Sequence, residues 1–214
     1  DERIYKSSNS GFYWTEVDSG LAQHLFLGVE FYNASYGIVT GEEGRVVVTT
    51  NGGTNWVSSN AGSSGLLRGV HIFNQQNAYV VGTPEQIYKT TNGGDSWSLV
   101  GSIDPSSYVT VTGFTFVNEN LGYAAAGGPT GGEVYKTTNG GVTWTALNIG
   151  YNLIDSRLNS IFFLDENNGF VSGGFNSRSV LKTTNGGVSW TQVETIAFGQ
   201  IQFINNQIGY AHRI

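Results

Sequence analysis

The 214-residue sequence contains no cysteine and no methionine, and only three prolines. Without cysteine there is no disulfide framework, no thiolate metal site and no cysteine nucleophile. Without methionine there is no initiator residue, so we expect the chain to be a processed product or an excerpt from a longer protein. No apolar run approaches the ~18 residues that a membrane-spanning helix needs, so no transmembrane segment is predicted.

Charge is also scarce. Charged residues make up 12% of the chain, about half of the usual share, and the formal net charge is −6. The ten basic residues are scattered along the sequence, which argues against a nucleic-acid partner. The low charge and the missing cysteine favour an extracellular or cell-surface location. Hydrophobic residues still reach 39%, which is enough for a sizeable core.

What the sequence has in excess is glycine, with 31 residues, together with a repeat that contains all five tryptophans. The repeat reads Thr-Thr-Asn-Gly-Gly-x-x-Trp in four complete copies, and a fifth, degenerate copy precedes them. The copies are Ser7–Trp14, Thr49–Trp56, Thr90–Trp97, Thr137–Trp144 and Thr183–Trp190. Successive tryptophans are 42, 41, 47 and 46 residues apart, a period typical of a four-stranded propeller blade.

A second pattern alternates with the first. An apolar run ends in a phenylalanine, and a small residue follows after a polar turn; the phenylalanines are Phe31, Phe73, Phe116, Phe163 and Phe203. Each unit therefore offers four short strands, which we name A to D. In the second complete unit they are predicted at 68–73, 78–82, 86–90 and 96–100. These runs favour β-branched and aromatic residues and show no helical period, which predicts an all-β fold.

The Asn-Gly pairs predict how strands C and D are joined. A two-residue type I′ turn needs positive φ at both central positions, which Asn and Gly adopt most readily. We expect the tryptophan of each repeat to begin strand D and to pack between neighbouring blades.

Counting residues predicts ring closure. The chain begins in strands C and D and ends in strands A and B, and the spacing from Phe203 across the joined ends to Trp14 matches the other repeats. We therefore expect one domain over 1–214, a five-bladed β-propeller with four antiparallel strands per blade, whose last blade is closed by both termini. The expected blades are 18–59, 60–101, 102–148, 149–193, and 194–214 plus 1–17.

The repeat Thr-x-Asn-x-Gly-x-x-Trp resembles the Asp-box, or BNR, repeat, with Asn where many copies carry Asp. The fuller signature Ile87–Trp97 is most similar to propellers resembling the photosystem II assembly and stability factor. This resemblance covers essentially the whole chain. It implies a propeller fold, and it leaves function open because Asp-box propellers include sialidases, xyloglucan hydrolases, sorting receptors and assembly factors. The assembly factors are seven-bladed with a basic partner surface, whereas this chain counts to five blades and has no basic cluster.

Several candidate sites were weighed against structural roles. The repeated box is interpreted as a turn and a blade-interface element, because every blade needs one. The segment Asp165–Gly169 has alternating oxygen side chains like a calcium loop but lacks the later bidentate glutamate, so no metal and no cofactor are predicted. His71 is expected to be a wall or core residue.

Catalysis finds little support in the sequence. Arg68, Arg157 and Arg178 are candidates for a sialidase-type arginine cluster, but the other sialidase motif is missing. A glycosidase needs a buried acid, and the loop acids are expected to be solvated; they are Glu42, Glu43, Glu85, Asp104 and Asp155. The chain is therefore predicted not to be an enzyme.

The variable loops are the strongest functional signal. The D–A and B–C loops differ between blades and share one face, and binding residues concentrate on such loops. Ligand-binding candidates are Asp104, Tyr108, Tyr151, Asp155, Arg157 and Arg178. The leading hypothesis is a monomeric, non-enzymatic binding propeller for carbohydrate or a protein segment. The alternatives are a glycoside hydrolase or sialidase-like enzyme, a purely structural domain of a surface protein or a designed repeat ring, a photosystem-type assembly factor, and ordinary solvated loops without a ligand.

Overall fold

The structure is a computed structural model, and its described part is all-β, as predicted. Apart from one short 3-10 turn, Glu42–Gly44, every regular element among the described residues is a strand. The chain divides into two compact units, Asp1–Leu99 (unit 1) and Val100–Ile214 (unit 2). The described residues are 3–17, 25–104, 110–128, 131–150, 157–174, 179–195, 198–203, 205 and 207–213.

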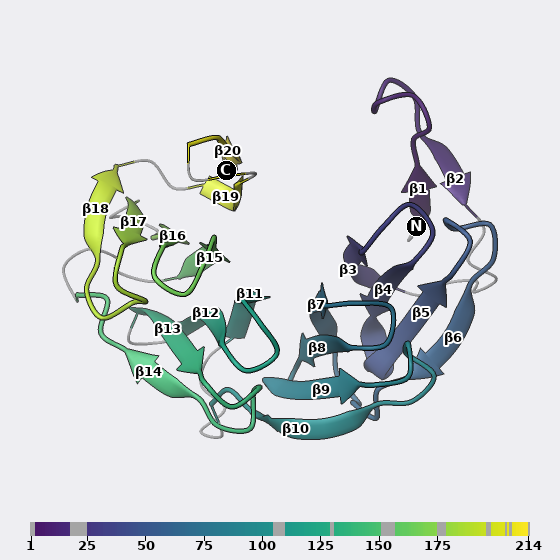
Figure 1. The fold of residues 1–214 in the computed structure, drawn as a ribbon, viewed down its shortest axis with the longest axis horizontal. Coiled ribbons are helices and arrows are strands. Elements are labelled where there is room, and N and C mark those ends of the chain that lie inside the picture. Colours follow the sequence, from purple (N-terminus) through teal and green to yellow (C-terminus); the bar gives the residue numbers. More distant parts are fainter. Residues whose placement is uncertain are drawn as a thin grey trace. The chain divides into compact units, whose positions relative to one another are not determined.

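Unit 1 contains the first nine strands and the start of the tenth (Figure 1). Its strands are β1 (Ile4–Lys6), β2 (Thr15–Val17), β3 (Phe26–Phe31), β4 (Gly37–Gly41), β5 (Arg45–Thr49), β6 (Val57–Asn60), β7 (Leu67–Ile72), β8 (Ala78–Gly82), β9 (Gln86–Thr90) and β10 (Ser98–Ser102). Strands β1 and β2 form a two-stranded sheet. Strands β3 to β6 form one four-stranded sheet, and strands β7 to β10 form another.

Unit 2 repeats this organisation. Its strands are β11 (Thr110–Phe116), β12 (Gly122–Gly128), β13 (Gly131–Thr137), β14 (Thr145–Leu147), β15 (Leu158–Phe163), β16 (Gly169–Gly173), β17 (Ser179–Thr183), β18 (Thr191–Glu194), β19 (Phe198–Phe203) and β20 (Gly209–Arg213). They form the four-stranded sheets β11–β14 and β15–β18 and the two-stranded sheet β19–β20.

Antiparallel sheets of four strands in sequence order are what a propeller of about five blades requires. In each complete sheet the four strands are A to D of the predicted repeat; in the second sheet, for example, Val80 of β8 is the Cα partner of Val70 on β7 and of Tyr88 on β9. The two-stranded sheets hold C and D (β1–β2) and A and B (β19–β20). Closure of a last blade by both termini, and a single domain over 1–214, stay predictions.

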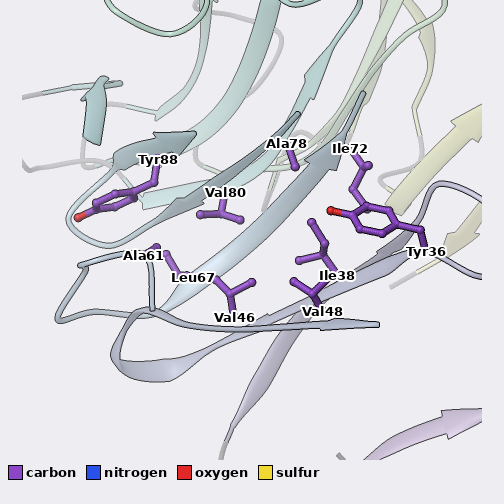
Figure 2. Close-up of a cluster of buried hydrophobic side chains, with 10 residues drawn as sticks. All are labelled: Tyr36, Ile38, Val46, Val48, Ala61, Leu67, Ile72, Ala78, Val80 and Tyr88. Atoms are coloured by element: carbon purple, nitrogen blue, oxygen red, sulfur yellow. The ribbon is translucent and has the colours of Figure 1, made fainter. Parts of the chain in front are cut away.

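The core of unit 1 lies between its two four-stranded sheets. Figure 2 shows ten buried side chains from both sheets, among them Ile38 and Val46 from the first and Leu67 and Val80 from the second. These four are fully buried. They belong to strands with apolar residues at consecutive positions, a pattern typical of strands that are covered on both faces. Burial of this kind supplies the main driving force for folding.

The core of unit 2 is built around an aromatic stack. The rings of Tyr123 on β12 and Phe163 on β15 are parallel, with centroids 3.5 Å apart. The Tyr123 hydroxyl donates to the backbone oxygens of Glu166 and Gly186, so this one side chain joins its own sheet to two turns of the next. Apolar residues from β13 to β17 complete the cluster.

The C–D turns differ from the predicted type I′ hairpins. Positive φ occurs at the two glycines of each Asn-Gly-Gly turn, such as Gly93 (70°) and Gly94 (88°). The asparagine serves as a hydrogen-bonding group instead: the Oδ1 of Asn92 accepts from the Thr90 hydroxyl and from the Ser96 N–H. The Thr90 hydroxyl in turn accepts from the Gly94 N–H. The prediction was wrong because the side-chain network closes a longer, seven-residue connection between the strands.

The tryptophans also sit slightly differently from the prediction. Each precedes strand D instead of beginning it; Trp97, for example, comes directly before β10. Its indole N–H donates to Ser59 Oγ of the preceding sheet and to the Gly94 carbonyl, both at 3.2 Å. Trp56 packs edge to face against Phe31 of its own sheet. The rings therefore contact their own sheet and, at Trp97, the neighbouring one.

The phenylalanine at the end of strand A explains the glycine at the start of strand B. At Gly37 an added Cβ would lie 2.6 Å from the Phe31 ring. At Gly122, Gly169 and Gly209 it would lie 2.6 to 2.7 Å from the ring of the phenylalanine that ends the preceding strand. In the second sheet the equivalent pair is Ile72 and Ala78. The sequence alignment on Phe73 was therefore wrong by one residue: the smaller Ile72 takes the phenylalanine position, which makes room for an alanine methyl group.

The A–B turns are closed by an Asx side chain in every described copy. In the fourth sheet the Oδ1 of Asp165 accepts from the backbone N–H groups of Asn167 and Asn168, and Asn33, Asn74, Asn118 and Asn205 make the same pair of bonds. The Asn168 side chain donates to both Asp165 oxygens. These bonds lower the pKa of Asp165 below its ordinary value and account for the calcium-like pattern as a turn.

Candidate functional site

The D–A and B–C loops lie at one end of each sheet, and in unit 2 this end carries a cluster of polar side chains. Tyr135 on β13 is buried, and its hydroxyl donates to the carboxylate of Glu133 two residues earlier on the same strand. Burial raises the pKa of Tyr135 above its ordinary value, and Glu133 and then Asp104 raise it further because a phenolate beside carboxylates is disfavoured. We call Asp104, Glu133 and Tyr135 the acidic rim.

Arg157 lies at the same end of this sheet. It forms an isolated antiparallel bridge with Gly127 at the end of β12, next to Ala126, which is the Cα partner of Glu133. A Cβ at Gly127 would lie 2.6 Å from the Arg157 Cγ, so the glycine makes room for the arginine stem. Arg157 is exposed.

Of the six predicted ligand-binding residues, Asp104 and Arg157 lie among the described residues, and their role in binding stays a prediction. The other four, Tyr108, Tyr151, Asp155 and Arg178, lie outside the described residues. Sequence reasoning did not propose Glu133 and Tyr135 as binding residues, and the structure places both in strand β13.

A sequence signal for this pair existed. In a strand, residues two apart point to the same side, and Tyr88 in the second sheet donates to the Gln86 side chain at the same spacing, at 2.7 Å. A tyrosine two residues after Glu or Gln on strand C is therefore a repeated element at the loop end.

Unit 1 has a different arrangement at its own loop end. Arg45 opens β5, and its buried Nε has no hydrogen-bond partner among the described residues. The Glu42 carboxylate accepts from the Leu25 N–H, while Glu43 has a φ of 53°. Glu85 is only 5% exposed, so the expectation that this acid is solvated was wrong. The B–C loop folds it inward and thereby removes its carboxylate from water.

His71 is half-buried on strand A of the second sheet, as expected for a wall or core residue, and it faces a half-buried acid. Its Nδ1 lies 3.9 Å from the Glu30 Oε1 on β3. Burial raises the pKa of Glu30 to about 7, and a hydrogen bond with the backbone of Ile72 offsets only part of this rise. Burial lowers the pKa of His71 to about 4. Both side chains therefore favour their neutral forms.

We expect these two groups to give opposite pH dependences of stability. Glu30 contributes its full stabilisation of the folded state below pH 4.5, which is its pKa in the unfolded chain. This contribution is lost as the pH rises through about 7, its pKa in the folded state. His71 contributes its full stabilisation of the folded state above pH 6.5, which is its pKa in the unfolded chain. This contribution is lost as the pH falls through about 4, its pKa in the folded state. Relative to wild type, Glu30→Gln should become more stable as the pH rises from 4.5 to 6.5, and His71→Gln less stable.

Between pH 4.5 and 6.5, the free energy of unfolding of each variant relative to wild type is expected to change by about 1–2 kcal/mol. This figure allows for solvent screening, since the Glu30 side chain is 32% exposed and that of His71 is 22% exposed. Urea unfolding at several pH values measures it. The double variant serves as the control, because it should show neither slope. Parallel pH profiles for wild type and both single variants would contradict the assignment.

Two further structural facts concern the described residues. Within those ranges no three His, Asp or Glu side chains come together as a metal site would require. No helix in this part of the chain is long and apolar enough to cross a membrane.

The comparisons with known proteins agree with the repeat. The sequence model of the family described as photosynthesis system II assembly factor YCF48 matches residues 6–151. The chain therefore belongs to this family of BNR-repeat propeller proteins. A search of curated proteins finds no match to the sequence.

Solved structures show the same fold. YCF48 bound to D1 peptide is 17% identical with a TM-score of 0.63, and the match covers 98% of this chain and 81% of that one. YCF48 from Cyanidioschyzon merolae is 22% identical with a TM-score of 0.63, over 86% of this chain and 61% of that one. The GH74 enzyme of Niastella koreensis is 21% identical with a TM-score of 0.71, over 94% of this chain but only 38% of that one.

Proposed function

We propose that this chain is a non-enzymatic binding protein that holds an extended protein segment at the loop end, where the acidic rim of unit 2 contacts basic residues of the segment. The observation that carries the proposal is the meeting of Asp104 and Glu133 at the buried hydroxyl of Tyr135, on the variable end of the fold. The family description as an assembly factor and the solved complex of YCF48 with a peptide support a protein segment as the ligand.

Charge sets the expected ligand chemistry. The chain carries a formal charge of −6, and the two carboxylates favour lysine or arginine side chains through charge-assisted hydrogen bonds. Arg157, exposed at the same end of the sheet, favours a carboxylate on the same segment. A place outside the cell or on its surface, supported by composition, is a further part of this proposal. A photosystem-type assembly role, supported by the family description, is the alternative to it.

Binding should depend on the acidic rim. With a fluorescent peptide library that varies lysine, neutral and glutamate content, we expect lysine-rich members to bind. Asp104→Asn combined with Glu133→Gln should weaken this binding at least tenfold, or about 1.4 kcal/mol. Fluorescence anisotropy at two salt concentrations measures it, and added salt should weaken the wild-type complex.

The matched control is Glu119→Gln combined with Glu166→Gln, which removes the same charge from A–B turns at the opposite end of the sheets. This pair should leave the affinity within about twofold. Equal losses for both pairs would show that only net charge matters, and no preference for lysine would overturn the proposal.

A glycoside hydrolase is the second candidate. The GH74 structures share the fold, and two carboxylates near one point, here Asp104 and Glu133, are what glycoside hydrolysis uses. Release of reducing ends from xyloglucan by the wild-type chain, abolished by the Asp104→Asn and Glu133→Gln pair, would favour this candidate over the binding protein. Binding of xyloglucan without hydrolysis would identify carbohydrate as the ligand.

A further inference from the structure

Each complete sheet carries a polar residue near the start of strand C, four positions before the first threonine of the Thr-Thr-Asn-Gly-Gly repeat. In chain order these residues are Arg45, Gln86, Glu133 and Ser179. Residues two apart on a strand point to the same side, so the residue two positions later determines what each polar side chain contacts first. In the same order these second residues are Val47, Tyr88, Tyr135 and Leu181.

Where the second residue is a tyrosine, its hydroxyl bonds to the polar side chain. Tyr88 donates to the Gln86 Oε1 at 2.7 Å, and Tyr135 donates to the Glu133 carboxylate. Both rings are buried, at 4% and 6% exposed, and Figure 2 shows the Tyr88 ring among the core side chains of unit 1. Because the ring is packed, the position of its hydroxyl is fixed, and the bonded side chain is fixed with it.

Where no tyrosine is present, the polar side chain has another partner or none. The Ser179 Oγ accepts from the Gln192 side chain at 2.7 Å. The buried Nε of Arg45 has no hydrogen-bond partner among the described residues. Val47 and Leu181 offer no hydroxyl in these two sheets. The comparison indicates that the tyrosine, and not the strand alone, orients the residue two positions before it.

Glu133 is the one acid among these four polar residues, and it belongs to the acidic rim. Immobilising a flexible side chain on binding weakens an affinity by roughly threefold to tenfold. A carboxylate that a hydroxyl already orients has lost this freedom before the ligand arrives. The hydroxyl occupies one of the about four acceptor positions of the carboxylate, so the others stay open to a ligand.

We propose that Tyr135 is a positioning residue of the acidic rim: its hydroxyl fixes the Glu133 carboxylate in the orientation that meets a basic side chain of the bound segment. This inference rests on the proposed function, because it assigns a role within the same site. Tyr135 acts through Glu133, since its own ring is buried in the sheet.

Tyr135→Phe tests this role because it keeps the packed ring and removes only the hydroxyl. With the lysine-rich peptide that binds the wild type most tightly, we expect roughly threefold to tenfold weaker binding, measured by fluorescence anisotropy. Tyr88→Phe is the matched control. It removes the same kind of bond from Gln86, a neutral residue in unit 1, and should leave the affinity within about twofold. Circular dichroism and urea unfolding verify that each variant is folded.

A double-mutant cycle separates positioning from a general loss of structure. In Glu133→Gln the tyrosine has no carboxylate to orient, so adding Tyr135→Phe should change the remaining affinity by less than about twofold. If Tyr135→Phe weakens binding as much in this background as in the wild type, the proposal is overturned, because the tyrosine then acts through packing.

The same measurements distinguish this proposal from the proposed function. Wild-type affinity of Tyr135→Phe, together with weak binding by the Asp104→Asn and Glu133→Gln pair, would overturn the positioning role and leave the proposed function intact. Unchanged binding by that pair of rim substitutions would overturn the proposed function, and the positioning role with it.

Discussion

Replacing Tyr123 by alanine is expected to lower the free energy of unfolding by about 3–5 kcal/mol, the usual cost of removing a buried aromatic ring. The side chain is fully buried and stacks on Phe163 of the next sheet. It also accepts the Lys136 ammonium above its ring, at 5.2 Å. Alanine removes all of these contacts and leaves a cavity between the two sheets.

Tyr123→Phe is the control that separates the ring from the hydroxyl. It keeps the stack and removes only the bonds to the Glu166 and Gly186 oxygens, so a loss of about 1 kcal/mol is expected. Guanidinium unfolding followed by tryptophan fluorescence measures both variants. An equal loss for the two would assign the stability to the hydroxyl, against our interpretation that the stacked ring joins the sheets.

Gly94→Ala is expected to cost about 2–4 kcal/mol. The residue has a φ of 88°, where an alanine is strained by about 1–2 kcal/mol. An added Cβ would also lie 2.6 Å from Val48 Cγ2 on the preceding sheet, and such overpacking typically costs a further 1–3 kcal/mol. The Gly94 carbonyl accepts from Ser59 Oγ at 2.7 Å, so the turn cannot move away without losing this bond.

Gly62→Ala is the matched control for Gly94→Ala. Its φ is also 88°, but the nearest atom to an added Cβ is the Tyr88 Cε1, 3.9 Å away. It should therefore show the backbone strain alone, about 1–2 kcal/mol. Thermal and urea unfolding of both variants measure the difference, and equal losses would show that the contact between Gly94 and Val48 does not constrain the turn.

Much of the fold could be predicted because the repeat shows each rule several times. Five tryptophans at nearly constant spacing predicted the number and order of strands, and strand boundaries such as β8 and β9 were placed correctly. Local details were less predictable. The turn type was wrong because the side chains of Thr90 and Asn92 bond to the backbone, and spacing alone does not reveal such a network.

The candidate site was only half predictable for a related reason. Asp104 and Arg157 stood out as charged loop residues, whereas Glu133 and Tyr135, which lie within a strand, were not proposed as binding residues. A side chain on a strand becomes part of a site only through what the loops beside it contribute. The interpretation of Glu85 as solvated failed for the opposite reason, because a loop residue turned inward.

The sequence by itself, short of cysteine, methionine and charge, determined an all-β repeat protein whose strands alternate with polar turns, because hydrophobic period and turn residues are local properties. Only the tertiary structure decided which side chains meet: Tyr135 with two carboxylates, and Glu30 with His71. These pairings join residues that are far apart along the chain or hidden in strands. They depend on how whole sheets pack, and no local pattern in the sequence records that packing.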